Sequence, residues 1–133
     1  MEKSGSAFNI HRGGLMPQEE MLEVSNKQKQ LKIGIPSEDH RVESRVPITP
    51  EAVEILTGYG HEVMLETGAG KAANYMDRDY SEKGGIILEN RQEIFNRCDI
   101  LLKISPPTLE QIRWMKERQT LLSSFQVYTH RDE

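Results

Sequence analysis

A strand, a polar loop, a helix and a second strand follow one another early in this sequence, and this order constrains the fold more than any other feature. The apolar run at 31–35 predicts the first strand, which Pro36 ends because proline has no N–H to give to a neighbouring strand. Thr49 can cap a helix that has Pro50 at its first position. A second apolar strand is predicted at 61–65. This succession predicts a βαβ unit and therefore parallel strands.

The same alternation of strands and helices continues along the chain. Further strands are predicted at 86–88, 100–104 and 120–125, with helices over 77–83, capped by Asp77, over 90–97 and over 108–115. The nearly unbroken apolar run at 100–104 is typical of a strand that is covered on both faces. Five strands that alternate with short helices predict a doubly wound, mainly parallel five-stranded α/β sheet.

Size, charge and cysteine content narrow the class of protein. The chain has 133 residues, which is one domain's worth and enough to bury a core. Its net charge of −4 and the lack of a basic face argue against a nucleic-acid partner. One cysteine, Cys98, excludes an internal disulfide and fits a reducing compartment. No apolar run approaches the roughly 20 residues that span a bilayer, so we expect a cytoplasmic protein without a membrane span.

The patterning divides the chain into two parts. Residues 1–30 are polar, and we expect a helical or disordered extension there, with a helix over 16–29 as one form of it. Residues 31–133 form the predicted domain. The sequence stops at Glu133, soon after a predicted strand, with no helix to cover it. Because a parallel sheet needs both faces covered, we expect this domain to be part of a larger protein.

A glycine-rich stretch at 68–73 allows two interpretations. It fits G-x-G-x-x-A, follows a strand and has Glu89 at the end of the next strand, which is the pattern of a dinucleotide-binding turn. However, the segment 71–81 has no wide apolar face, and a helix cap at Asp77 would leave 68–76 as a loop. We therefore favour a plain strand-to-helix turn and expect no cofactor-binding residue here. No Cys, His or Asp cluster has metal-ligand spacing, so no metal site is expected either.

An ordered series of short motifs resembles one known family. The motifs are KIGIP at 32–36, ESRV at 43–46, ITP at 48–50, GHEV at 60–63, ETGAG at 66–70 and DILLK at 99–103. Together, over about residues 32–126, they are similar to the N-terminal domain shared by alanine dehydrogenase and the alpha subunit of proton-translocating nicotinamide nucleotide transhydrogenase. The resemblance implies a flavodoxin-like or Rossmann-like domain on the substrate side of the enzyme. It also implies that NAD or NADP is bound mainly by a separate domain that this chain lacks.

The resemblance assigns one substrate-binding residue that is present here. Arg45 corresponds to the family arginine that holds the carboxylate of pyruvate or alanine, and a planar guanidinium can pair with a carboxylate through two hydrogen bonds. Without the resemblance, Arg45 would be interpreted as a solvated loop charge beside Glu43 or Asp39.

Two other family positions carry different residues. Where related dehydrogenases have a lysine and a histidine, this chain has Ser105 and Gln126, and neither can transfer a proton at neutral pH. Lys103 shares a strand face with Ser105, so its ammonium can reach the cleft; otherwise it is a strand-end lysine extending to solvent. His130 lies four residues beyond Gln126 and is a weaker substitute for the histidine. We keep Lys103 and Gln126 as candidate catalytic positions and Ser105, with Arg45, as substrate-binding.

These residues predict a function through the resemblance. We expect the N-terminal domain of a nicotinamide-dependent oxidoreductase, either alanine dehydrogenase-like, converting L-alanine to pyruvate and ammonia, or transhydrogenase-like. Its expected partners are a small carboxylate or a nicotinamide substrate, the missing NAD-binding domain and further copies of itself. Because the proton-transferring pair is missing, the alternative is a degenerate, non-catalytic module for binding or oligomerisation.

Overall fold

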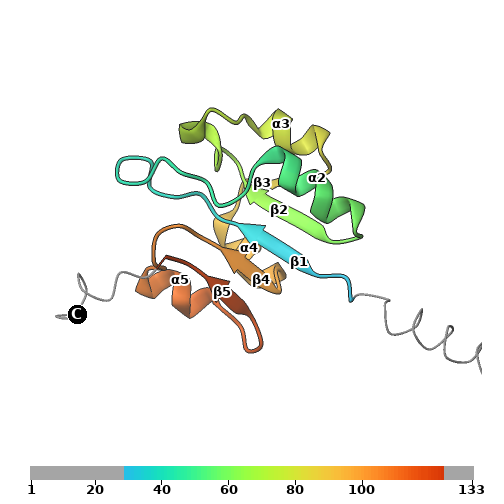
Figure 1. Ribbon diagram of the computed structural model, residues 1–133. Helices are drawn as coiled ribbons and strands as arrows, with labels where there is room; N and C mark the ends of the chain where they lie inside the picture. The colour runs from blue at the N-terminus through green and yellow to red at the C-terminus, as the bar shows by residue number, and fades with distance from the viewer. Residues whose placement is uncertain (1–28, 125–133) are drawn as a thin grey trace, which may run out of the picture.

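The computed structural model describes residues 29–124 and places five strands in one sheet whose neighbours all run parallel (Figure 1). This confirms the predicted doubly wound α/β class. The predicted extension at 1–30 lies, apart from its last two residues, outside the described residues. In chain order the elements are β1 (Lys32–Ile35), α2 (Pro50–Gly58), β2 (Glu62–Glu66), the 3₁₀ turn η1 (Lys71–Ala73), α3 (Asp77–Glu82), β3 (Ile86–Leu88), α4 (Arg91–Arg97), β4 (Ile100–Leu102), α5 (Leu109–Trp114) and β5 (Thr120–Leu122).

The strand order creates a point at which the direction of winding reverses. The order is β3-β2-β1-β4-β5, so the chain moves outward from β1 to β3 and then crosses back to place β4 on the other side of β1. Of the two kinds of sheet expected, this is the order of a Rossmann-like sheet. Ligands of open parallel sheets bind outside the carboxyl ends of the strands at such a reversal, here between β1 and β4.

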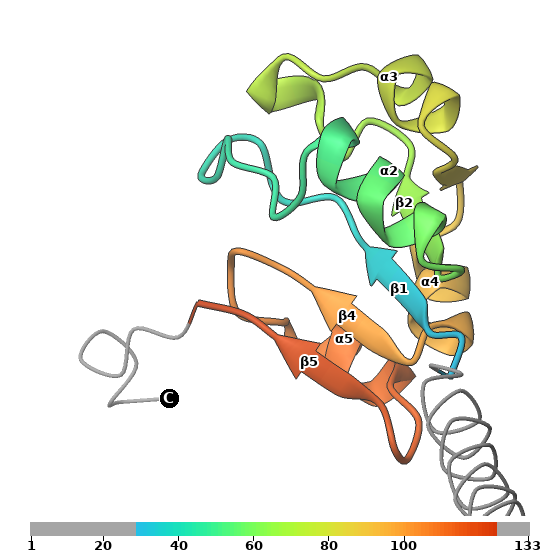
Figure 2. The same ribbon diagram turned by 45° about the vertical axis from the view of Figure 1, so that its right-hand side comes forward.

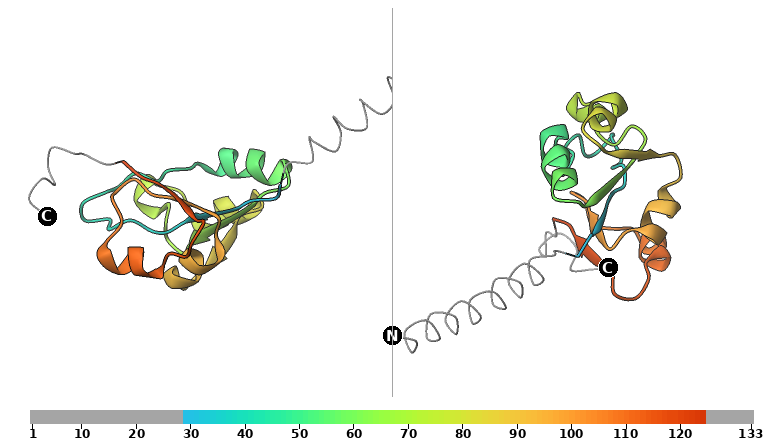
Figure 3. Two further views of the ribbon diagram at one scale, coloured as in Figure 1. Left: turned by 90° about the horizontal axis from the view of Figure 1, so that it is seen from below. Right: turned by 90° about the vertical axis from the view of Figure 1, so that its right-hand side faces the viewer.

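Helices cover the two faces of the sheet and bury a separate core on each. On one face α2 and α3 pack on the side chains of β1 and β2, while α4 and α5 lie on the opposite face (Figure 3). The first core includes Ile35, Val53 and Tyr80, and the second includes Ile94 and Phe95, all at most 1% exposed. Figure 2 shows α2 lying over β1 and β2, with no helix of the described part in front of β4 and β5.

Of the helix caps predicted for α2 and α3, one lies where the sequence predicted it and one does not. Thr49 caps α2 by accepting the Ala52 N–H at 3.3 Å, as predicted. Asp77, however, is not the cap of α3: Met76 occupies that position and Asp77 is the first helical residue. The Asp77 carboxylate instead accepts the backbone N–H of Gly68 at 2.8 Å. The side chain that was expected to start a helix therefore fixes the glycine-rich turn.

A glycine in β1 allows α4 to lie directly on the sheet. A Cβ at Gly34 would come within 2.6 Å of both Cys98 Sγ and Ile94 Cγ2, closer than packed atoms allow. Since α4 follows β3, its beginning lies at the carboxyl edge of the sheet. Within residues 29–124, no helix has the length and apolar character needed to cross a bilayer.

Candidate functional site

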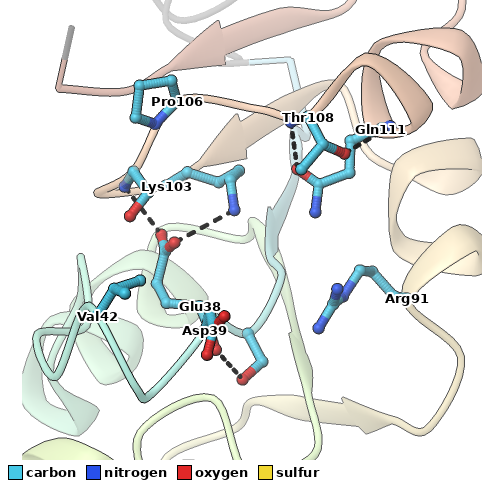
Figure 4. A pocket seen from close by; sticks show the side chains of 10 residues that line it. Glu38, Asp39, Val42, Arg91, Lys103, Pro106, Thr108 and Gln111 are labelled. Carbon is cyan, nitrogen blue, oxygen red and sulfur yellow. Dashed lines mark hydrogen bonds and ion pairs between the residues drawn. The ribbon is translucent and has the colours of Figure 1, made fainter. Parts of the chain in front are cut away.

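A pocket of about 340 Å³ opens at the carboxyl edge of the sheet, at the reversal between β1 and β4 (Figure 4). Its walls come from the loop after β1, the segment after β4, the beginning of α4 and the beginning of α5. The lining residues are Ser37, Glu38, Asp39, Val42, Arg91, Lys103, Ser105, Pro106, Thr108 and Gln111. The pocket therefore lies where the strand order alone places the ligand site of such a sheet.

A buried ion pair joins the two sides of this pocket. Lys103 Nζ lies 3.3 Å from Glu38 Oε2, and the two side chains are only 4% and 3% exposed. Two buried charges this close compensate each other, because either one alone would lose its hydration without a partner. Lys103 is thus not a strand-end lysine that extends to solvent, and that alternative is wrong.

The other oxygen of Glu38 holds the backbone that follows β4. Glu38 Oε1 accepts the N–H of Ile104 at 2.6 Å and that of Ser105 at 3.3 Å. One carboxylate therefore fixes Lys103 and the turn that carries Ser105. The structure brings these two predicted site residues together in the pocket, but sequence reasoning missed the glutamate that positions them.

A second pair of charges closes the side of the pocket next to α4. Arg91 Nε donates to Glu66 Oε2 at 2.8 Å, and the same oxygen accepts the N–H of Ser37 at 2.7 Å. Sequence reasoning missed Arg91 and Glu66 as well. The available signal was their position, because Glu66 ends β2 and Arg91 follows β3, both at the edge where the pocket lies.

Arg45 does not line the pocket. It lies in the loop between β1 and α2, its side chain is 73% exposed, and its Nε and Nη2 each donate to the Glu43 carboxylate at 2.8 Å. These hydrogen bonds lower the pKa of Glu43 to about 2 and raise that of Arg45. A substrate carboxylate would have to replace Glu43 at this guanidinium.

The glycine-rich turn has little capacity left for a pyrophosphate. The N–H groups of Gly68, Ala69 and Lys71 donate to Asp77, Glu66 and Gly68 respectively, each within 3.1 Å. A Cβ at Gly70 would meet the Tyr80 ring at 2.6 Å, so this glycine makes room for a core side chain. Both observations support the plain strand-to-helix turn over a dinucleotide-binding one.

Gln126 and His130 lie outside the described residues. Within residues 29–124, no group of three or more His, Cys, Asp or Glu side chains could hold a metal ion.

Fold and pocket together define the class: an open, doubly wound α/β domain with a small polar pocket at its reversal point. Residues 34–133 match the family model described as alanine dehydrogenase/PNT, N-terminal domain, and the chain belongs to this family. The predicted family is thereby confirmed.

Both alanine dehydrogenases and a transhydrogenase alpha subunit are similar to this chain. It is 36% identical over 91 residues to an alanine dehydrogenase of Mycolicibacterium smegmatis, which covers 68% of this chain and 24% of the relative. It is 35% identical over 95 residues to the NAD(P) transhydrogenase subunit alpha of Cereibacter sphaeroides, which covers 71% of this chain and 18% of the relative. The chain thus spans about a quarter or less of the length of these relatives.

Solved structures agree with this assignment. An L-alanine dehydrogenase structure superimposes with a TM-score of 0.70 at 28% identity, covering 77% of this chain and 28% of that chain. The transhydrogenase from Sinorhizobium meliloti gives a TM-score of 0.67 at 23% identity, covering 74% of this chain and 29% of that chain, which shows the shared fold.

Proposed function

We propose that this chain is the substrate-side domain of a nicotinamide-dependent oxidoreductase that acts on a small carboxylate, with alanine and pyruvate as the first substrates to test. The observation that supports this most is the pocket at the reversal point, which contains a fixed cation, Lys103, and a hydroxyl group, Ser105, on one turn. Membership of the family supports the proposed reaction class, and the relatives' names suggest the substrates to be tested.

The residues of this chain would divide the work between holding the substrate and handling a proton. Lys103 is the proposed proton donor and acceptor, since its ammonium lies in the pocket and Glu38 fixes its position. Ser105 would hydrogen-bond the substrate carbonyl or amino group, and Gln126 would line the pocket beside it. Arg45 is the residue to which the resemblance assigns the substrate carboxylate, and in this role it would have to exchange Glu43 for the substrate. A nicotinamide held by a separate domain supplies or accepts the hydride.

The test uses the natural protein that contains these 133 residues. Alanine-dependent formation of NADH, or pyruvate- and ammonia-dependent oxidation of NADH, is the expected result. Hydride exchange between nicotinamide analogues without alanine turnover would assign the chain to the transhydrogenase side instead. If the protein shows neither reaction, the oxidoreductase proposal fails.

One observation favours the second candidate, a non-catalytic module. Lys103, the one lysine that lines the pocket, is paired with Glu38, and Ser105 occupies the position at which related dehydrogenases have a lysine. A module of this kind would bind a ligand or assemble copies of itself without hydride transfer. Sedimentation of the natural protein, together with a search of its downstream sequence for a strand followed by G-x-G-x-x-G, distinguishes the two. The module requires that no such segment follows.

A further inference from the structure

The guanidinium of Arg91 lies at the pocket, although Arg91 was not among the site residues expected from the sequence. Its Nε is held at 2.8 Å by Glu66 Oε2, and that oxygen is itself held at 2.7 Å by the N–H of Ser37. The guanidinium is therefore fixed through one of its three nitrogens. Figure 4 shows the Arg91 side chain entering from α4 and pointing toward the loop that carries Glu38 and Asp39.

Within residues 29–124, the N–H groups on the two terminal nitrogens of Arg91 have no acceptor, so they can donate to a ligand. A guanidinium carries five N–H donors in a planar fork. Among residues 29–124, Glu66 is the acceptor that contacts Arg91, and it contacts Nε. The Arg91 side chain is 38% exposed, so the terminal nitrogens can reach a molecule that enters the pocket.

The other charges of the pocket are already paired. Lys103 and Glu38 neutralise each other, and Glu38 also accepts two backbone N–H groups. Asp39 is bound by Arg41 at 2.7 Å. Of the charged groups that line the pocket, Arg91 is thus the one whose remaining donors point at the ligand space without a described acceptor.

We propose that Arg91, rather than Arg45, binds the carboxylate of a small organic acid in this pocket through its two terminal nitrogens. A planar group with two acceptor oxygens matches this fork, which a single lysine ammonium does not. Arg45 differs, because both Nε and Nη2 of that residue already contact Glu43. A pocket of about 340 Å³ limits the acid to a small one. The choice of a carboxylate rests on the proposed function, but the binding can be measured without any redox reaction.

The experiment is equilibrium dialysis of labelled pyruvate against the natural protein. Arg91→Gln should weaken pyruvate binding about 10- to 100-fold, the effect of losing a charge-assisted pair. Arg91→Lys keeps the charge without the fork and should recover only part of the affinity. Arg78→Gln removes an exposed arginine of α3 whose partner is Glu82, and binding should stay within about threefold of the parent.

The outcomes separate this proposal from the proposed function. Pyruvate binding that depends on Arg91 in a protein without hydride transfer supports the carboxylate site and rejects the oxidoreductase. Hydride transfer with an unchanged KM for pyruvate in Arg91→Gln supports the oxidoreductase and rejects the carboxylate site at Arg91. If the parent protein binds no pyruvate, or if Arg91→Gln binds as tightly as Arg78→Gln, the site assigned to Arg91 is wrong. Because Arg91 also ties α4 to β2, circular dichroism must show that each variant is folded.

Discussion

Glu38 connects two strand ends that are far apart in the chain. Its carboxylate reaches Lys103 across 65 positions and holds both the ammonium and the backbone after β4. Because this charge pair is buried, removing one partner destabilises the protein far more than removing one partner of an exposed pair. At the residue scale, this one side chain fixes the geometry of the pocket.

Removing Glu38 should therefore be costly. Glu38→Ala leaves the Lys103 ammonium buried without its partner, and we expect a loss of about 3 to 5 kcal/mol in the free energy of unfolding. Urea denaturation followed by Trp114 fluorescence measures it. Asp39→Ala, on the same loop, removes an exposed pair with Arg41 and a hydrogen bond from the Arg41 N–H, and should cost far less. Equal losses in the two variants would contradict the role of the buried pair.

The pKa of Glu43 reports on what Arg45 binds. The Arg45 hydrogen bonds lower this pKa from 4.5 to about 2, so Arg45→Gln should raise it toward 4.5 in an NMR titration of the carboxyl carbon. A lowered pKa in the folded state stabilises the fold at pH values above 4.5, and this contribution is lost as the pH falls toward 2. Arg41→Gln should leave Glu43 unchanged.

The same titration tests the substrate role of Arg45. If a substrate carboxylate replaces Glu43 at Arg45, saturating pyruvate should raise the Glu43 pKa in the natural protein. A Glu43 pKa that stays near 2 with pyruvate bound would remove Arg45 from the site.

At the scale of elements, the position of α4 depends on a missing side chain in β1. Gly34→Ala would push a Cβ against Cys98 and Ile94, and we expect a loss of about 1 to 3 kcal/mol in stability from this overpacking. Gly58→Ala is the matched control, because no atom lies within 4 Å of its added Cβ and it lies in α2. It should instead stabilise the protein by about 0.4 to 1 kcal/mol. Urea denaturation distinguishes the two signs.

The contact between α3 and the start of α2 depends on one buried hydroxyl. Tyr80 Oη donates to the Ile48 carbonyl at 2.9 Å, and burial raises the Tyr80 pKa to about 12. Tyr80→Phe keeps the ring but leaves that carbonyl unpaired, for an expected cost of about 1 to 3 kcal/mol in thermal or urea unfolding. Tyr59→Phe, at a position 70% exposed, should change little. An unchanged stability in Tyr80→Phe would show that this hydrogen bond contributes nothing to the fold.

The elements were more predictable than the contacts between them. Apolar periodicity and residues such as Thr49 and Pro50 act locally, so strands and helices could be placed from the sequence. Asp77 shows the limit of this reasoning, since its carboxylate binds Gly68 rather than capping its own helix. Arg91 and Glu66 could not be paired in advance, because their contact depends on how the ends of β2 and β3 meet in space. The resemblance named Arg45, Ser105 and Gln126, but it says nothing about the residues that position them.

At the scale of the molecule, the strand order sets where the pocket lies. The pocket lies at the reversal between β1 and β4, and the sheet brings together its charged residues from the loop after β1, the beginning of α4 and the segment after β4. The face of β4 and β5 that no described helix covers ends in Leu122, which is 55% exposed (Figure 2). The described helices therefore leave one face of β4 and β5 open, although parallel sheets are usually covered on both faces.

The most direct test of this account is a crystal structure of the natural protein with pyruvate bound. The account predicts pyruvate in the pocket, with its carboxylate on the terminal nitrogens of Arg91 and its carbonyl within reach of Lys103 or Ser105. Pyruvate bound away from this pocket, with Arg91 and Lys103 untouched, would contradict it.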